Sequence, residues 1–500
     1  MLRAVVLRSY GKVSPGIHGS RAGTVRHAMC RRGIQRLGAR ATEVRLAICG
    51  LGLLSMLLVS LPMPAQQKTG PGVPADDSLS LYGITLYGVI DIGLQYDTHS
   101  APFTPYRPAA SGNIVRQNSR QSVLGLTPSN MGQSRVGLQG IEPLNEEWSA
   151  TFQIETFFNP QSGQLADSVR SLIANNGKAL TEQSVAVDGS SAGQAFQTAF
   201  VGLKSNHFGT LTFGRQVTLL SEGTIKYDPN YLATAFGLLG ASNTYSGGGS
   251  NEDNRLNSAA QYILSLDDQV HAAALYKFNG SDGSGRTAVQ ANVGGSLAGA
   301  SIDAYYSKVK SSITASALSA VQVATLPRGD AVSNSLAATV SDNTAYALMG
   351  LYRRDPLKFF AGYEYIKYTD PKDPLDPGFI GLGGHVLAFL NNKAYTEPKI
   401  VQVYWTGVRY AVLPHLQLTA AYYGVHQSAY GSAAMAGCSS NAHSVCRGDL
   451  EALSFDADYR FNVHFDAYLG AMYSGVHDGL ASGYLATTNI NPTVGFRYKF

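Results

Sequence analysis

Hydrophobic and polar residues alternate along much of the chain, from about residue 81 to the C-terminus. Every second residue from Val494 to Phe500 is hydrophobic, for example, whereas the residues between them are Gly495, Arg497 and Lys499. A period of two predicts β-strands that each have one apolar face. The alternating segments are long enough to cross a bilayer as tilted strands of about 9–11 residues. No segment of useful length shows the period of an amphipathic helix.

The connections between these segments alternate in length. Short turns, such as residues 143–146 and 354–357, alternate with long stretches rich in Gly, Ser, Asn and Pro. The long connections cover about residues 97–133, 159–195, 217–254, 309–342, 369–399 and 425–449. Sixteen strands are predicted, near residues 81–96, 133–141, 148–158, 196–205, 209–216, 255–266, 270–278, 287–295, 299–309, 343–353, 358–368, 399–410, 415–424, 450–460, 464–474 and 489–500. The predicted fold class is all-β, a transmembrane antiparallel 16-stranded β-barrel with short periplasmic turns and long extracellular loops.

A closed barrel follows from the chemistry of the bilayer. Lipid offers no hydrogen-bond partners to the backbone, so strands cross it only where every edge is paired. Tyr residues near strand ends, such as Tyr96 and Tyr410, suit the boundary between hydrocarbon and water. The alternative is a soluble all-β protein, which would have strands of about 5–6 residues and similar connections at both rims. The strand lengths and the difference between the two rims favour the barrel.

Composition supports this class and excludes others. Charged residues make up 14% of the chain and the mean hydropathy is −0.05, so the chain is neither disordered nor a bundle of membrane helices. The net charge of +4 comes from residues 1–65, which hold ten Lys or Arg and one acid, whereas residues 66–500 carry a net charge of −5. No basic stripe interleaved with aromatic residues remains in residues 66–500, so no nucleic-acid partner is predicted.

The N-terminal region has the features of a secretory signal. Basic residues up to Arg45 precede an apolar run from Leu46 to Leu61, and Ala65 is a small residue suited to cleavage. The alternative is a membrane anchor, but a run of 16 residues is shorter than the roughly 20 that a spanning helix needs. We predict a leader over residues 1–65 that is removed, with translation starting at Met1 or further along the chain, and a short extension over residues 66–80.

Two of the four cysteines, Cys30 and Cys49, leave with the leader. Cys438 and Cys446 remain in a polar, Gly-rich stretch, and an even pair in an exported protein favours a disulfide. A metal site that includes His443 is the alternative, but two Cys and one His are a weak signal. We predict no metal and no cofactor.

Seven segments resemble the Gram-negative general porins, particularly their Tyr- and Gly-rich branch with short turns. They follow the order of that family over nearly all of the mature chain, and include SRVGLQGIEPL at 134–144, AFVGLKSNHFGTLTFGRQ at 199–216 and VGFRYKF at 494–500. The resemblance implies a 16-stranded, water-filled pore in the outer-membrane lipid that assembles as a homotrimer. It also implies that the third long loop, about residues 217–254, folds inward to narrow the channel, and that Phe500 is the terminal aromatic recognised during assembly.

Candidate pore-lining residues follow from the resemblance and from strand parity. Arg135 occupies the SR position of the family, and Arg255 begins the strand after the constriction loop, where relatives also carry an Arg. Parity places Arg135, Glu155 and Arg409 opposite hydrophobic neighbours, on the face that should line the pore.

Arg215 does not fit this parity. It alternates in step with Leu211 and Phe213, on a face where a charge at mid-bilayer costs roughly 2–4 kcal/mol. We expect Gly214 to break the register and turn Arg215 into the pore.

The constriction loop departs from the family. It is longer and more apolar than usual, with AFGLLG at residues 235–240, and its acidic cluster is thin. Glu222 and Asp228 are the main candidates for lining the constriction, and Glu252 and Asp253 are further ones.

The predicted function is passive diffusion of ions and small hydrophilic solutes. Basic wall residues that face an acidic loop would create a transverse field at the constriction, which orders polar solutes and excludes apolar ones. One alternative is an outer-membrane barrel enzyme, which would need a nucleophile, a base and an orienting acid; no catalytic residues are predicted, because no His falls in a recognisable constellation. The other alternative is a closed, adhesin-like barrel whose large loops bind a partner.

Overall fold

The structure is a computed structural model of the chain. It describes residues 79–104, 106, 113–185, 195–242, 254–266, 269–279, 286–431, 438 and 443–500. The predicted leader, residues 66–78 of the predicted extension, Glu252 and Asp253 lie outside the described residues.

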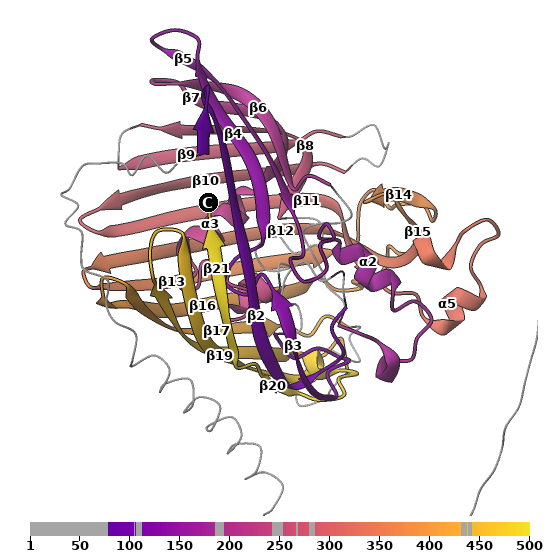
Figure 1. Ribbon diagram of the computed structural model, residues 1–500. Helices are drawn as coiled ribbons and strands as arrows, with labels where there is room; N and C mark the ends of the chain where they lie inside the picture. The colour runs from indigo at the N-terminus through magenta and orange to yellow at the C-terminus, as the bar shows by residue number, and fades with distance from the viewer. Residues whose placement is uncertain are drawn as a thin grey trace, which may run out of the picture. The chain divides into compact units, whose positions relative to one another are not determined.

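Sixteen antiparallel strands form the barrel, and each coincides with one of the predicted strands. They are β2 (Ile84–Ser100), β4 (Arg135–Pro143), β5 (Trp148–Phe157), β6 (Thr198–Ser205), β7 (Gly209–Val217), β8 (Arg255–Ser265), β9 (Val270–Lys277), β10 (Ala288–Leu297), β11 (Ala300–Ser316), β12 (Ser335–Arg354), β13 (Leu357–Thr369), β16 (Lys399–Leu413), β17 (Leu416–Gln427), β18 (Gly448–Arg460), β19 (Phe465–Asp478) and β21 (Thr493–Lys499). β2 pairs with β4 on one edge and with β21 on the other, which closes the cylinder. Figure 1 shows the last strand, β21, beside β2. The predicted 16-stranded barrel is confirmed.

The alternation of the sequence separates the two faces of the barrel. On β2, Ile90 and Leu94 are exposed on the outer face, whereas Asp91 and Gln95 are fully buried on the inner face. The pattern recurs around the barrel, so the outer face is apolar and suits contact with lipid tails, while polar side chains line the inside.

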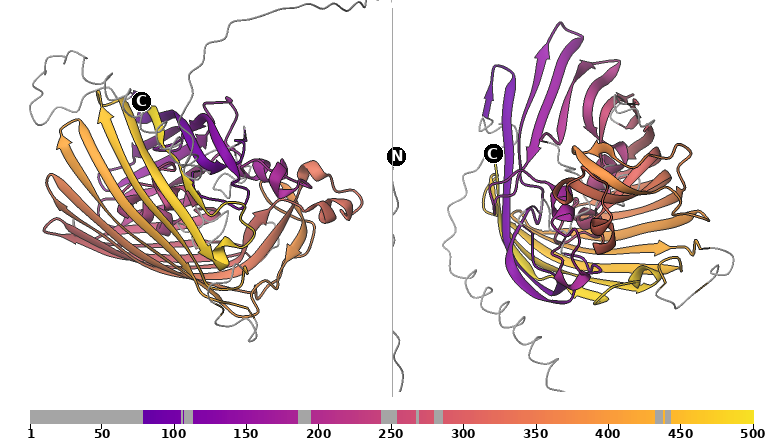
Figure 2. Two further views of the ribbon diagram at one scale, coloured as in Figure 1. Left: turned by 90° about the horizontal axis from the view of Figure 1, so that it is seen from below. Right: turned by 90° about the vertical axis from the view of Figure 1, so that its right-hand side faces the viewer.

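In the described part of the chain, five further strands lie outside this ring: β1 (Leu79–Leu81), β3 (Gln121–Pro128), β14 (Phe379–Leu382), β15 (His385–Asn391) and β20 (Thr488–Ile490). β1 folds back on the start of β2, and β3 pairs with the far half of β2. Figure 1 shows β14 and β15 at the end of the barrel that carries the long loops, and Figure 2 shows the barrel from two further directions.

Strands β11 and β12 are longer than predicted. They reach Ser316 and begin at Ser335, so the stretch predicted as a loop over residues 309–342 is partly strand. These strand ends bury an apolar cluster at the long-loop end of the barrel, which includes Ile313, Leu336 and Leu387. Tertiary burial of this cluster extends the strands beyond the length that the bilayer alone requires.

Helical segments within the described residues are short. They are α2 (Ser168–Ile173), α3 (Leu219–Tyr227), α4 (Leu238–Ser242) and α5 (Ala320–Ala324), with 3₁₀ turns η1 (Leu180–Glu182), η2 (Val332–Asn334) and η3 (Gly479–Ala481). In the part of the chain that the structure describes, no helix has the length and hydropathy to cross a membrane. α3 and α4 belong to the predicted constriction loop, and their apolar side chains pack with inner-face residues of β8 to β18.

Candidate functional site

The predicted constriction loop starts as a helix inside the barrel. The Thr218 side chain caps α3 by accepting a hydrogen bond from a backbone N–H of the first turn. Glu222 in the first turn and Lys226 in the last turn both suit the helix dipole. Gly223 allows the helix to approach the wall closely, because a Cβ there would lie 2.3 Å from the Tyr305 ring. The local sequence therefore fixes where the loop begins and how near it lies to the wall.

The end of α3 is attached to two wall strands. Lys226 Nζ donates to Asp303 Oδ2 on β11 at 3.1 Å, and the Tyr227 hydroxyl lies 2.7 Å from the Ser301 hydroxyl on the same strand. The Trp405 indole N–H on β16 donates to the Tyr227 carbonyl at 3.0 Å. These contacts hold the loop against one side of the lumen.

Asp228 attaches the next part of the loop to β17. Its carboxylate accepts from the Tyr423 hydroxyl at 2.6 Å and from the Leu232 backbone N–H at 2.7 Å. The side chain is fully buried, and burial raises the pKa of Asp228 above its ordinary value. The prediction that Asp228 lines the constriction is therefore wrong, because its carboxylate is used to anchor the loop and does not reach the lumen.

The titration of Asp228 gives a testable pH dependence. Because its folded-state pKa is raised, its contribution to loop stability is present at low pH and is lost as the pH rises through that value. We expect wild-type channels to show less open-channel current noise at pH 4 than at pH 8. Asp228→Asn, which mimics the neutral carboxyl group, should remove this difference, and Asp228→Ala should be noisy at both values. Greater noise at pH 4 that Asp228→Asn abolishes would contradict the assignment.

The far part of the loop is attached to the seam of the barrel. The Thr234 hydroxyl donates to the Ser129 carbonyl at 2.5 Å, and Asn491 Nδ2 donates to the Ala235 carbonyl at 2.9 Å. Ser129 and Asn491 lie beside β2 and β21. Since α3 is attached to β11 and β16, the loop crosses the interior from one wall to another.

The apolar sequence of the loop has a structural role. Phe236, Leu238 and Leu239 are completely buried, and the Phe236 ring packs edge-on against Tyr468 of β19 at 6.1 Å. Burial of apolar side chains is worth roughly 1.5–3 kcal/mol for each large residue. The departure from the family in residues 235–240 therefore corresponds to a loop held in the lumen by packing as well as by hydrogen bonds.

Arg135 and Glu155 lie together on the inner wall as predicted from parity. Arg135 Nε lies 3.2 Å from Glu155 Oε2, and the Tyr87 hydroxyl donates to the same oxygen at 3.0 Å. The Arg135 side chain remains 35% exposed, whereas that of Glu155 is 10% exposed. The guanidinium is thus the member of the pair that faces the interior space.

Arg255 joins this group from β8. Its guanidinium lies 4.6 Å from the centre of the Phe157 ring, and Phe157 is the cross-strand partner of Arg135. Glu222 of the loop is exposed and accepts a hydrogen bond from Gln261 Nε2 of β8 at 3.3 Å. The structure therefore brings the Arg255 guanidinium close to the strand pair that carries Arg135 and Glu155, with Glu222 on the loop facing β8.

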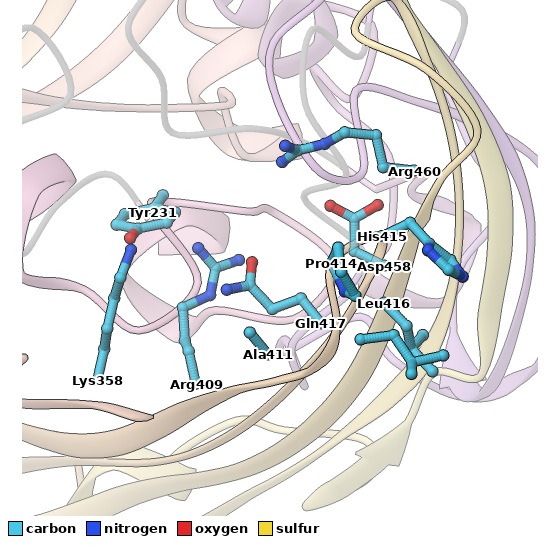
Figure 3. A pocket seen from close by; sticks show the side chains of 11 residues that line it. Tyr231, Lys358, Arg409, Ala411, Pro414, His415, Leu416, Gln417, Asp458 and Arg460 are labelled. Carbon is cyan, nitrogen blue, oxygen red and sulfur yellow. The ribbon is translucent and has the colours of Figure 1, made fainter. Parts of the chain in front are cut away.

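Arg409 lies apart from that group. It is on β16, its guanidinium is 4.1 Å from the centre of the Tyr231 ring of the loop, and its Nε donates to the Thr419 hydroxyl at 3.3 Å. Figure 3 shows that it borders a pocket with Lys358 and Arg460, two cations that are not among the residues predicted from the sequence. Their inward parity was available from the sequence, but the strand ends that bring them together were not.

The prediction that Gly214 turns Arg215 inward is wrong. The ladder between β7 and β8 is irregular next to Gly214, which has a φ of 140°, but the extra residue is on β8. Thr212 and Gln216 remain together on the inner face. Arg215 therefore keeps the outward parity of Phe213, and its guanidinium donates to Asn257 Oδ1 at 2.5 Å.

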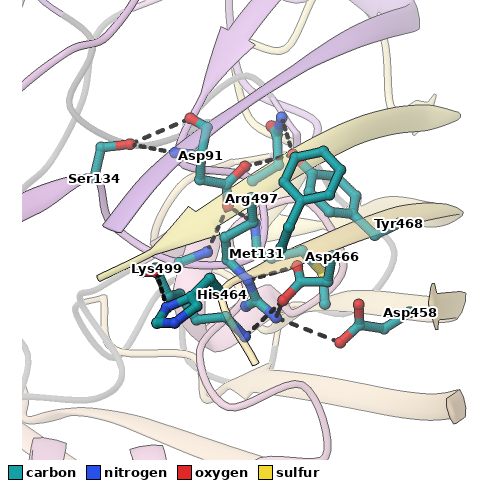
Figure 4. A network of polar contacts seen from close by, with 12 residues as sticks. Asp91, Met131, Ser134, Asp458, His464, Asp466, Tyr468, Arg497 and Lys499 are labelled. Atoms are coloured by element: carbon teal, nitrogen blue, oxygen red, sulfur yellow. Dashed lines mark hydrogen bonds and ion pairs between the residues drawn. The ribbon is translucent and has the colours of Figure 1, made fainter. Parts of the chain in front are cut away.

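A polar network that was not predicted from the sequence joins the last strands to the first. Asp466 of β19 accepts hydrogen bonds from Arg497 of β21, and Lys499 Nζ lies 2.6 Å from the second Asp466 oxygen. Asp91 of β2 accepts from the Tyr468 hydroxyl and from the Met131 backbone N–H (Figure 4). Strand parity places these side chains inside, but only the closure of the barrel brings them together.

The structure joins Cys438 and Cys446 in a disulfide, with a Cα–Cα distance of 5.3 Å. Among the residues that the structure describes, no group of His, Cys, Asp and Glu is arranged to hold a metal ion.

A closed barrel with an apolar exterior, a charged inner wall and an inward-folded loop defines a porin-type β-barrel of the outer membrane. The chain belongs to the Gram-negative porin family, whose sequence profile matches residues 54–479. Its location is therefore the outer membrane of a Gram-negative cell.

The chain is also similar to individual members. It is 30% identical to an outer membrane porin protein of Bordetella pertussis over 146 residues, which are 29% of this chain and 31% of that relative. The anion-selective porin from Comamonas acidovorans has a similar structure, with a TM-score of 0.52 and 16% identity over 83% of this chain and 99% of that one. OmpT of Vibrio cholerae has a TM-score of 0.51 and 15% identity over 85% of this chain and all of that one. At these identities the solved structures support the fold alone.

Proposed function

We propose that this protein is a passive diffusion channel for ions and small hydrophilic solutes. The carrying observation is the arrangement of charged side chains around an interior that the constriction loop crosses, with the partly exposed Arg135 on one wall and Glu222 exposed on the loop. Reconstitution into planar bilayers tests the proposal. Stepwise openings in KCl support it, and silence at high protein concentration favours a closed, adhesin-like barrel.

Arg135 is the residue for which we propose a direct role in ion selectivity. Its guanidinium faces the interior, so Arg135→Glu reverses a charge beside the constriction and should shift the reversal potential in a KCl gradient towards cation selectivity. Arg328→Glu is the matched control, because Arg328 is exposed in the loop beside α5. An unchanged permeability ratio in Arg135→Glu would remove Arg135 from the constriction.

We also propose that the protein is not an enzyme. A Ser, a His and an acid do meet at the turn after β6, but the Ser205 hydroxyl donates to Glu147, and His207 Nδ1 contacts the same carboxylate. The imidazole is therefore not placed to take a proton from the Ser205 hydroxyl. These contacts fit a turn that is held together by side chains.

We infer that the protein assembles as a homotrimer. One edge of β3 pairs with β2, and no described residue pairs with its other edge. Leu124 and Leu126 of this strand are 66% and 50% exposed, and an unpaired apolar edge is unfavourable unless it is covered. A solved structure of Vibrio cholerae OmpT is described as a trimer form, with a TM-score of 0.51 and 14% identity. Light scattering of the detergent-solubilised protein measures the state, and a Leu124→Asp/Leu126→Asp variant should shift it towards monomer.

The leader remains part of the proposal. We infer that residues 1–65 are removed during export, and N-terminal sequencing of protein purified from outer membranes should then begin at Gln66.

A further inference from the structure

A row of three cations crosses adjacent strands on the inner face, near the short-turn end. Arg353 of β12 is the cross-strand partner of Lys358 of β13, and Lys358 is the partner of Arg409 of β16. Their inner position follows from neighbouring burial, since Phe360 is 2% exposed and Phe359 is 45% exposed. Like charges placed directly opposite on a sheet destabilise it. The row therefore imposes a cost on the fold that the barrel itself does not require.

At the same rim, a second row of charged residues crosses the seam of the barrel. Arg460, Asp466, Arg497 and Asp91 are successive cross-strand partners on β18, β19, β21 and β2, so their charges alternate in sign across the seam. Asp466 and Arg497 form a close ion pair within this row. The row of three cations on β12, β13 and β16 lacks this alternation of sign. The contrast points to a role of these cations other than holding the strands together.

Two cations of this row, Lys358 and Arg409, border a cavity of about 310 Å³. Lys358, Arg409 and Arg460 extend into it from three strands, and Gln417, His415 and Asp458 complete its polar lining (Figure 3). The side chains of Lys358 and Arg460 form no hydrogen bond or ion pair with any described residue. Arg460 also forms no ion pair with its cross-strand partner Asp466. Two donors that carry full charge are thus open to a solute.

The nearby acids do not neutralise this group. Asp458 lies 3.3 Å from Arg497 Nη2 and is shared with the seam. Asp456 is fully buried beside Arg409, so it offsets the charge of Arg409 without lining the cavity. Lys358 and Arg460 remain as the uncompensated charges, and an oxyanion is the group that ammonium and guanidinium donors bind best.

We propose that this cavity is a binding subsite for small oxyanions, carboxylates or phosphate, at the short-turn end of the channel. The inference rests on the proposed channel function. The cavity is at the lower end of the sizes that hold small molecules, so the solute is small. Lys358 and Arg460 bind it, and Arg409, held by Tyr231 and Thr419, supplies a fixed positive charge. A solute that leaves the constriction would pause here before release.

The test is single-channel conductance of the full protein as a function of salt concentration. Potassium phosphate and potassium succinate at pH 7 are the two probes, and KCl is the reference. A binding subsite makes the conductance saturate, and Lys358→Gln and Arg460→Gln should each raise the half-saturating concentration about fivefold, which corresponds to about 1 kcal/mol. Lys204→Gln is the matched control, since Lys204 is exposed at the same end of the barrel. Lys204 is also on the inner face, because its cross-strand partner Ser149 has the same parity on β5 as Glu155.

The outcomes separate this inference from the channel function. Saturation with phosphate alone assigns the subsite to phosphate, and saturation with succinate alone assigns it to carboxylates. In either case, a raised half-saturating concentration in both variants but not in Lys204→Gln supports the subsite. The subsite is overturned if both variants have the half-saturating concentration of the wild type, or if the control changes equally. The channel function survives that result as long as openings in KCl persist. Absence of openings in every salt would instead overturn the channel function.

Discussion

Replacing Asp466 with asparagine is expected to lower the free energy of unfolding by about 3 kcal/mol, because it leaves buried cations without their counter-charge. Asp466 is fully buried and lies 2.9 Å from Arg497 Nε and 2.6 Å from Lys499 Nζ. Both cations are on β21, the strand that pairs with β2 to close the barrel. The variant should unfold at lower urea concentration in detergent, as measured by the loss of β-structure.

Asp449→Asn is the matched control. Asp449 is on the neighbouring strand and forms its own ion pair with His426 at 2.7 Å, but both side chains are more than a third exposed. Exposed pairs contribute about 0–1 kcal/mol, so this variant should unfold close to wild type. Equal effects of the two substitutions would show that the Asp466 network is not what holds the seam.

Deleting the loop segment 219–242, together with its continuation to residue 253, is expected to raise the single-channel conductance at least about twofold, because conductance follows the narrowest part of a pore. The loop is attached to β11, β16, β17 and the seam, so it crosses the lumen. Val217 and Arg255 are cross-strand partners, and a short Gly-rich turn can therefore join β7 to β8. Planar-bilayer recording in KCl measures the effect.

A deletion of residues 320–330, around α5, controls for loop removal as such. These residues are mostly exposed and lie in the long-loop region between β11 and β12. Their removal should leave the conductance unchanged. If the constriction-loop variant folds, as judged by its β-spectrum, and conducts like wild type, the loop does not limit the current.

The two charge rows at one rim differ in the order of their signs. Across the seam the signs alternate, and Asp466 forms an ion pair with Arg497. On β12, β13 and β16 three cations follow one another without an acid between them. Like charges placed directly opposite destabilise a sheet, and solvent or a solute in the channel can supply the opposite charge.

Strand number and facing were predictable because both are local properties. The two-residue period follows from the pleat, and it placed Glu155 and Arg409 inside from the sequence alone. The lengths of β11 and β12 were not predictable, because their ends form strands only through the apolar cluster around Ile313 and Leu336.

The candidate site also combines features that the sequence predicts with features that depend on tertiary contacts. Parity correctly placed Arg135 and Glu155 on one face, but it could not show whether an inward carboxylate is open or buried. Asp228 is buried because Tyr423, 195 residues away in the chain, donates to it. Arg215 stays outside because the extra residue in the ladder lies on β8 and not at Gly214.

The sequence by itself determined the class of barrel, the number of its strands and the side to which most side chains point, because a bilayer requires each strand to satisfy the same local pattern. Only the tertiary structure decided which inward charges are neutralised, which are buried under the loop and which remain open to solutes. That decision depends on contacts between strands distant in sequence, and these form only when the cylinder closes and the loop packs inside it.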